Sequence, residues 1–289
     1  MKPLPRWFRA FVRIVGALAP PLMVAITYRM FWNLGKPMTV RADALPVHTR
    51  AQRETLAIGE RTAVVYRWGT GPETVLLVHG WRGRASQFAA LIDALESPER
   101  TIVAFDAPGN GDSPGDRTDL RDYLAVIRAV ADGAGGLDLL VGHSFGVMGI
   151  FVAVREGVRA NRMVSIAGTA DMNSAYATFA HALELPRRVD VRLRRKIERQ
   201  VFDGDTGIWR RFVSELEPTD QTPLLIIHDR DDRTVELSQA ERIASAHLGP
   251  TTEVYTSGLG HTRVLSDPRV LQAIARFASE SVRTRSAGE

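Results

Sequence analysis

The sequence contains no cysteine, so it forms no disulfides, offers no thiolate nucleophile and has no cysteine ligands for a metal. Acidic residues are absent from residues 1–36, which carry +6. Since the whole chain carries +4, the rest carries −2. No basic stripe interleaved with aromatic residues occurs in that near-neutral part, so we expect no nucleic-acid partner. At 289 residues, the chain is long enough for one large domain.

Long apolar runs are also missing. Residues 14–28 are uncharged, but Pro20 and Pro21 interrupt them, and a spanning helix needs about twenty apolar residues. The preceding segment has the pattern of a basic amphipathic helix; its basic residues are Arg6, Arg9 and Arg13, and its apolar ones are Trp7, Phe8, Phe11, Val12, Ile14 and Val15. Three interpretations stay open: a helix pair packed on the body, an interfacial membrane helix, or a signal or span. We expect a cytoplasmic protein, with peripheral contact to the inner face of the membrane through residues 1–36.

A Gly-x-Ser-x-Gly pentapeptide at residues 142–146 centres on Ser144. Residues 137–141 before it predict a short buried strand, and residues 149–154 after it predict a helix. A serine at such a junction has a strained backbone, which projects its hydroxyl from the top of a sheet. Gly142 and Gly146 would let strand and helix approach closely. A glycine-rich turn with a capping serine is the alternative, so the other segments matter.

Residues 74–78 predict a second strand, which ends in His79, Gly80 and Trp81. The amides of Trp81 and Phe145 could together stabilise the oxyanion that forms on an acyl group. We expect His79 to be structural, because it precedes Ser144 and adjoins this proposed oxyanion hole. Residues 101–105 lead into a loop rich in Gly, Pro and Asp, in which Asp106 is expected to organise the loop.

Two later segments supply an acid and a base. Residues 223–227 predict a strand that ends in an acidic turn, where Asp229, Asp231 and Asp232 compete to orient an imidazole. His261 follows the last predicted strand on a glycine-flanked loop. Serine, acid and histidine in this chain order are what nucleophilic catalysis on an open α/β sheet requires.

Together these motifs resemble the α/β-hydrolase superfamily over residues 55–280. The resemblance implies a mostly parallel central sheet with helices on both faces and a small helical cap. It implies that Ser144, Asp232 and His261 are the catalytic residues, with Trp81 and Phe145 at the oxyanion hole. Asp229 stands where the family usually has glycine, which leaves Asp231 in competition. Asp171 lies near an acid position that some relatives use.

Residues 169–221 predict helices over 172–185, 187–202 and 208–216, a length that favours a cap. Phe179, Trp209 and Phe212 would line an acyl pocket or form the cap's core. We therefore expect an N-terminal extension and connector over residues 1–53 and a hydrolase domain over residues 54–284.

The expected activity is hydrolysis of a small-molecule carboxylic ester or thioester through an acyl-enzyme, without metal, nucleotide or flavin. Ser144 argues against the relatives that use an aspartate nucleophile on epoxides or haloalkanes. An acyltransferase with the same residues and a non-catalytic binding protein with this fold are the alternatives.

Overall fold

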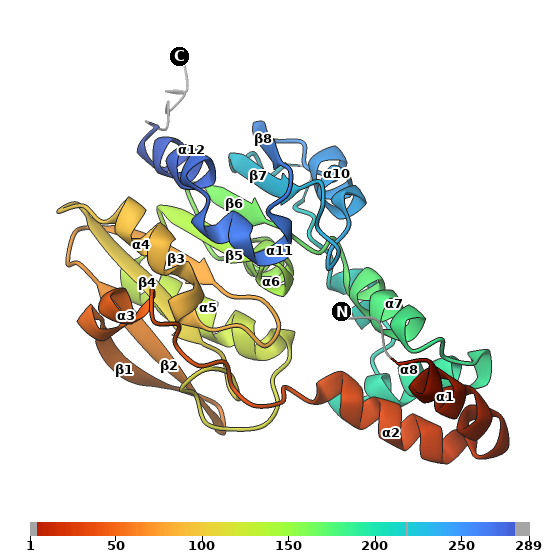
Figure 1. Ribbon diagram of the computed structural model, residues 1–289. Coiled ribbons are helices and arrows are strands. Elements are labelled where there is room, and N and C mark those ends of the chain that lie inside the picture. Colours follow the sequence, from red (N-terminus) through yellow and green to blue (C-terminus); the bar gives the residue numbers. More distant parts are fainter. Residues whose placement is uncertain (1–4, 218, 281–289) are drawn as a thin grey trace.

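An eight-stranded sheet forms the centre of the molecule (Figure 1). The structure is a computed structural model that describes residues 5–217 and 219–280. The strands lie in the order β1-β2-β4-β3-β5-β6-β7-β8, and all neighbours are parallel except β1–β2 and β2–β4. Their bounds are β1 Gln52–Ile58, β2 Arg61–Trp68, β3 Glu73–Val78, β4 Arg100–Asp106, β5 Leu139–His143, β6 Met163–Ile166, β7 Leu224–Asp229 and β8 Thr251–Thr256. This is the mostly parallel sheet that the sequence predicts.

Helices cover both faces of the sheet, which explains why its central strands are apolar throughout. In β3, Leu76 and Val78 face the core shared with α5 (Leu120–Ala134), α6 (Phe145–Arg155) and α10 (Leu237–Ala246). Val75 and Leu77 face the other core, shared with α3 (Leu45–Arg50), α4 (Ala89–Leu95) and α12 (Pro268–Ser279). Three short helices lie in the connections of this sheet: η1 (Ala85–Phe88), α11 (Gly260–Arg263) and η2 (Val264–Ser266).

A helical lobe extends from the sheet (Figure 1). Three of its helices follow β6 and agree with the expected cap, although the third is shorter than predicted: α7 (Met172–Ala182), α8 (Arg187–Val201) and α9 (Ile208–Arg211). The other two are α1 (Arg6–Leu18) and α2 (Pro20–Trp32), which break at Ala19, just before the two prolines. Helices α1 and α2 contact each other, and α2 also contacts α8. The N-terminal extension and the cap therefore form one lobe.

Among the described residues, none of the helices combines the length and the apolar character needed to cross a bilayer. The sheet begins at Gln52, slightly before the expected domain boundary at residue 53. The expected end of the domain at residue 284 lies outside the described residues.

Candidate active site

Ser144 occupies a sharp turn between β5 and α6, with φ of 56° and ψ of −120°. L-residues rarely adopt a positive φ, and such strain persists only where the surroundings impose it. Close packing imposes it here. A Cβ on Gly146 would lie 2.4 Å from the carbonyl oxygen of Val78, and one on Gly142 would lie 2.8 Å from Cα of Val147. Both glycines are thus required by the approach of α6 to the sheet, as the sequence predicts.

His261 lies between Ser144 and Asp232, which come from the ends of different strands. Its Nε2 is 2.9 Å from Oγ of Ser144, and its Nδ1 is 2.7 Å from Oδ2 of Asp232. With the proton on Nδ1, this nitrogen donates to the carboxylate and leaves the lone pair of Nε2 directed at the hydroxyl. The serine and the acid that the sequence predicts therefore both contact the predicted base.

Asp232 is buried, and both oxygens of its carboxylate accept hydrogen bonds. Its Oδ1 accepts hydrogen bonds from the backbone amides of Thr234 (2.7 Å) and Val235 (3.0 Å). Burial alone would raise the pKa of Asp232, but the hydrogen bond from His261 and these amides lower it below its usual value. Asp232 is therefore held as an anion that faces the imidazole.

The neighbouring carboxylates have other partners. Asp231 accepts from the amide of Gly258 at 2.7 Å. Asp229 accepts from the hydroxyl of Thr256 (2.7 Å) and from the amide of Leu259 (3.0 Å). These two aspartates thus brace the loop that carries His261, and Asp231 is not its partner. The glycine that the family usually has in place of Asp229 would leave these donors without that acceptor.

Asp171 has no contact with Ser144, Asp232 or His261. It caps α7 by accepting from the amide of Ser174 at 2.7 Å, and it pairs with Arg242 at 2.6 Å. Asp171 therefore does not take the place of Asp232, because its carboxylate is engaged at the start of the cap.

The segment after β3 lies against the turn that carries Ser144. A Cβ on Gly80 would lie 2.8 Å from Cβ of Ser144, so the backbone leading to Trp81 passes directly beside the serine. Within the described residues, the amides of Trp81 and Phe145 have no hydrogen-bond acceptor. An oxyanion hole needs amide donors that are free in this way.

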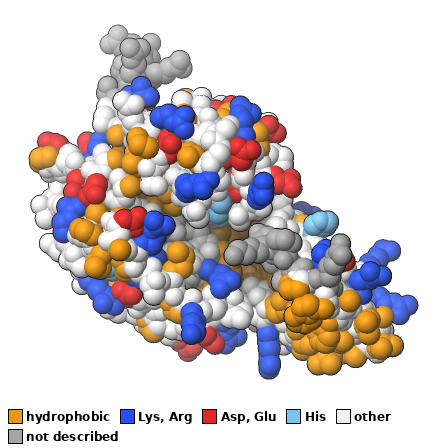
Figure 2. All heavy atoms as spheres, in the orientation of Figure 1, with side chains coloured by type: hydrophobic (Ala, Val, Ile, Leu, Met, Phe, Trp, Pro, Cys, Tyr) orange, Lys and Arg blue, Asp and Glu red, His pale blue; other side chains and the backbone are white. Residues whose placement is uncertain are grey.

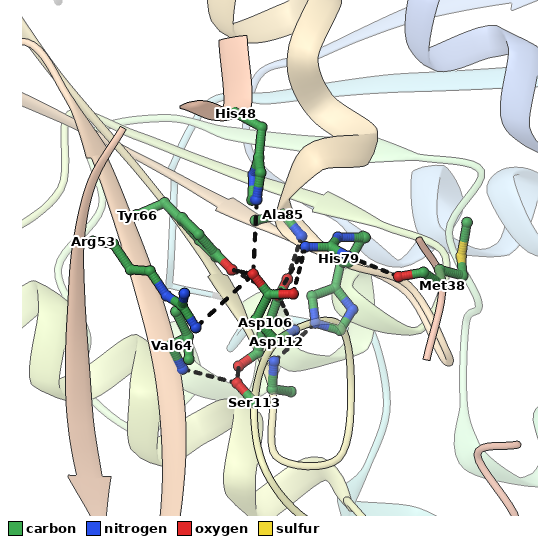
Figure 3. A network of polar contacts seen from close by, with 12 residues as sticks. Met38, His48, Arg53, Val64, Tyr66, His79, Ala85, Asp106, Asp112 and Ser113 are labelled. Atoms are coloured by element: carbon green, nitrogen blue, oxygen red, sulfur yellow. Dashed lines mark hydrogen bonds and ion pairs between the residues drawn. The ribbon is translucent and has the colours of Figure 1, made fainter. Parts of the chain in front are cut away.

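A buried polar network fixes this segment (Figure 3). Asp106 accepts from the amides of Ala85 and Asp112, both at 2.7 Å, and from the hydroxyl of Tyr66 at 3.0 Å. Arg84 approaches the same carboxylate at 3.6 Å. Asp106 therefore ties its own loop to the start of η1, which is the organising position that the sequence predicts for it.

His79 belongs to the same region and is fully buried. Its Nε2 accepts from the amide of Ala107 at 3.0 Å, and its Nδ1 lies 2.7 Å from the carbonyl of Gly80. Burial lowers its pKa. It is a neutral structural side chain, as expected, and it is not in contact with the hydroxyl of Ser144.

His143, the residue before Ser144, contacts the loop that carries His261, which the sequence does not predict. Its Nε2 is 2.9 Å from the carbonyl oxygen of His261, and the two rings are 4.8 Å apart. Its Nδ1 is 3.2 Å from Nε2 of the Gln87 side chain. Burial, and then the adjacent His261, lowers the pKa of His143 to about 3, so it is neutral and can donate to that carbonyl. The only signal in the sequence is its place within the pentapeptide.

Aromatic side chains connect the site to the helical lobe. The ring of Trp32, at the end of α2, lies 6.1 Å from that of Trp81, which in turn lies 5.5 Å from Phe145. The N-terminal extension therefore packs against the segment beside Ser144.

The three aromatic residues proposed for the cap are buried within the lobe. Trp209 lies 5.3 Å from Tyr176 and donates from its indole to Glu198 at 2.7 Å. Phe212 packs on Phe202. Phe179 packs on Phe31 of α2. These contacts are those of core residues, which was one of the two interpretations of the sequence.

Comparison with known proteins gives the family context. A family model described as the alpha/beta hydrolase family matches residues 75–274. Among solved structures, the alpha/beta hydrolase domain-containing protein 10 from mouse aligns with a TM-score of 0.60 and 17% identity over 78% of this chain and 96% of that one. An esterase from Rhodococcus sp. ECU1013 aligns with a TM-score of 0.55 and 18% identity, over 80% and 99%. Epoxide hydrolase A from Mycobacterium thermoresistibile aligns with a TM-score of 0.58 and 16% identity, over 78% and 98%.

Proposed function

The chain belongs to the alpha/beta hydrolase family, and from that premise we propose that it is a serine hydrolase of carboxylic esters or thioesters. The observation that carries this proposal is the continuous contact from Asp232 through His261 to the hydroxyl of Ser144, at 2.7 and 2.9 Å. The family alone would not suffice, because its members include an epoxide hydrolase as well as an esterase.

In the first stage, Ser144 attacks the acyl carbonyl while His261 removes the hydroxyl proton at Nε2. Asp232 stabilises the imidazolium that forms, and its lowered pKa keeps it ionised for this purpose. The amides of Trp81 and Phe145 donate to the oxyanion of the tetrahedral intermediate. His261 then returns the proton to the leaving alcohol or thiol, which departs and leaves an acyl-serine.

In the second stage, His261 removes a proton from water, and the resulting hydroxide attacks the acyl-serine. The tetrahedral intermediate collapses, the proton passes to Oγ of Ser144, and a carboxylic acid is released. The strained turn supports this assignment, because φ of 56° at Ser144 is the kind of strain that accumulates at reacting residues.

The test compares the wild type with Ser144→Ala on p-nitrophenyl esters and acyl thioesters of increasing chain length. We expect the substitution to reduce kcat by roughly 10⁴-fold or more, and we expect a fluorophosphonate probe to label only the wild type. Full ester hydrolysis by Ser144→Ala would disprove the assignment, and a wild type that does not react with the probe would indicate a binding protein.

The same panel separates hydrolysis from acyl transfer. A hydrolase releases the acid in water alone, whereas an acyltransferase forms its product only when an alcohol or amine acceptor is added. We expect release of the acid without an acceptor.

A further inference from the structure

Helix α1 has an apolar face that the described residues leave uncovered. Trp7, Phe11, Ile14 and Leu18 are spaced by four, three and four residues, which places them on one side of a helix. All four are exposed, with Trp7 at 71% and Leu18 at 82%. Leu22, at the start of α2, is also exposed. We call these five residues the apolar stripe.

A different side of α1 attaches it to the lobe. Val12 is fully buried, and a Cβ on Gly16 would lie 3.0 Å from Pro186, which directly precedes α8, and 3.2 Å from Val189 in its first turn. This close approach fixes the rotation of the helix about its axis. The apolar stripe is therefore not the face that folding buries, and an exposed apolar patch of this kind marks an interaction surface.

Basic side chains border the apolar stripe. Figure 2 shows hydrophobic side chains gathered over the end of the lobe, with Lys and Arg at the margin. Arg13 and Arg29 are exposed, and neither pairs with an acidic side chain in residues 5–217 or 219–280. Helix α8 adds further exposed basic residues, which are Arg187, Arg188, Arg192, Arg195 and Arg199.

Acidic partners are scarce around these charges. Residues 1–36 contain none. Arg9 pairs with Glu184 across the lobe at 2.7 Å, and the acidic residues of α8 are only Asp190 and Glu198. A second copy of the chain would bring the same positive surface and be repelled, whereas an anionic surface would be attracted.

We propose that the apolar stripe docks into the interface of a lipid bilayer that carries anionic headgroups. The large side chains enter the boundary between headgroups and acyl chains, and the flanking arginines contact lipid phosphates. This docking is independent of the proposed ester chemistry, because no residue of the stripe contacts Ser144, Asp232 or His261.

Sedimentation with large vesicles tests the proposal directly. Wild-type protein is mixed with vesicles of phosphatidylcholine alone or of phosphatidylcholine and phosphatidylglycerol in equal parts. We expect binding to the anionic vesicles and much weaker binding to the neutral ones. The triple variant F11S/I14S/L18S should reduce the partition constant by about 100-fold or more, since each substitution removes several buried methylene groups.

The charges are tested by R13Q/R29Q. Each arginine near an anionic surface contributes about 1 kcal/mol, so we expect roughly a five-fold loss per residue. Raising the salt from about 0.1 M to about 0.5 M should weaken wild-type binding, because it shortens the Debye length.

Two controls isolate the stripe. L45S/L248S replaces apolar residues that are exposed elsewhere and should bind vesicles like the wild type. Ser144→Ala should also bind normally, which separates docking from catalysis. Circular dichroism and hydrolysis of a soluble short-chain ester report whether F11S/I14S/L18S is folded.

Three outcomes would overturn the proposal. One is wild-type protein that stays in the supernatant with both kinds of vesicle. Another is equal binding by the wild type and by folded F11S/I14S/L18S. The third is a dimer in light scattering that F11S/I14S/L18S converts to a monomer without any vesicle binding, which would assign the stripe to a second copy.

Discussion

Asp229, Asp231 and Asp232 lie in one turn but have different roles, because each accepts hydrogen bonds from different donors. Asp232 faces the ring of His261, whereas Asp229 and Asp231 accept from backbone groups of the loop that carries this histidine. Their chemical type is the same, so the sequence around them leaves all three as candidates. What separates them is the direction of each side chain where β7 ends.

Replacing Asp232 by Asn should lower kcat for ester hydrolysis by about 10⁴-fold, since an amide neither stabilises the imidazolium nor holds the required tautomer. Asp231→Asn is the matched control, and we expect a small effect because its partner is the amide of Gly258. Steady-state kinetics on a soluble ester would measure both. Similar losses in the two variants would contradict the assignment of the acid.

His143 should make stability depend on pH. Its pKa is lowered to about 3 in the folded protein, against about 6.5 when unfolded. Its contribution is therefore complete above pH 6.5 and is lost as the pH falls toward 3, because only the unfolded state then binds the proton. Between pH 6.5 and pH 5, His143→Gln should lose about 2 kcal/mol less free energy of unfolding than the wild type.

Chemical denaturation at the two pH values would measure this difference. The other histidines are common to both proteins, so the comparison isolates one side chain. Replacement of the exposed His181 by Gln provides a control. Equal acid sensitivity in His143→Gln and the wild type would show that His143 is already charged in the folded protein.

At the scale of elements, the turn around Ser144 depends on how closely α6 meets the sheet. We expect Gly146→Ala to reduce the free energy of unfolding by about 1–3 kcal/mol or more, because the new methyl group would meet the carbonyls of Val78 and His79 at 2.4 and 2.6 Å. Gly149, also in α6, has room for a Cβ, with its nearest neighbour at 3.7 Å. Gly149→Ala should instead stabilise by about 0.5–1 kcal/mol.

Thermal or urea unfolding of both variants would decide the matter, and activity adds a second measurement. Gly146→Ala should also lose ester hydrolysis, because displacement of α6 moves Ser144 away from His261. If both alanine variants had the stability of the wild type, the close packing described for this turn would be wrong.

The sequence predicts the buried strands well because two covered faces leave an apolar signature, as in β3, β5 and β7. It did not predict the β1–β2 hairpin. Strand β1 lies at the edge of the sheet and is largely exposed, so it has no apolar run to detect. The length and composition of residues 169–221 predict the cap helices, but α9 ends at Arg211, earlier than expected.

At the scale of the whole molecule, the sequence could not predict where the N-terminal helices lie. Their composition leaves three alternatives: a packed helix pair, an interfacial helix, and a signal or span. The structure shows the packing that the first requires and the exposed apolar face that the second requires. Val12, Met23 and Val24 are buried in the lobe, while the apolar stripe is exposed. A single helix can show both because its faces are separate, and only the tertiary packing on α8 decides which face is covered.

The same hairpin joins the stripe to the candidate active site. Trp32 ends α2 and packs on Trp81, which follows the glycine beside Ser144. A lobe docked on lipid would therefore tether the site near the bilayer surface, where hydrophobic esters concentrate, with about 15 Å of α2 between Leu22 and Trp32. We expect F11S/I14S/L18S to keep wild-type kcat/KM on a soluble short-chain ester and to lose about ten-fold or more on a long-chain ester embedded in anionic vesicles.

The two substrates must be compared on the same protein preparation, so that their ratio cancels any loss of active enzyme. L45S/L248S should keep the wild-type ratio, because its substitutions lie outside the stripe. A uniform loss on both substrates would mean that the triple variant damages the site through Trp32 and Trp81. Unchanged activity on both would mean that docking, where it occurs, does not deliver the substrate, since an enzyme that takes its ester from solution gains nothing from the bilayer beside it.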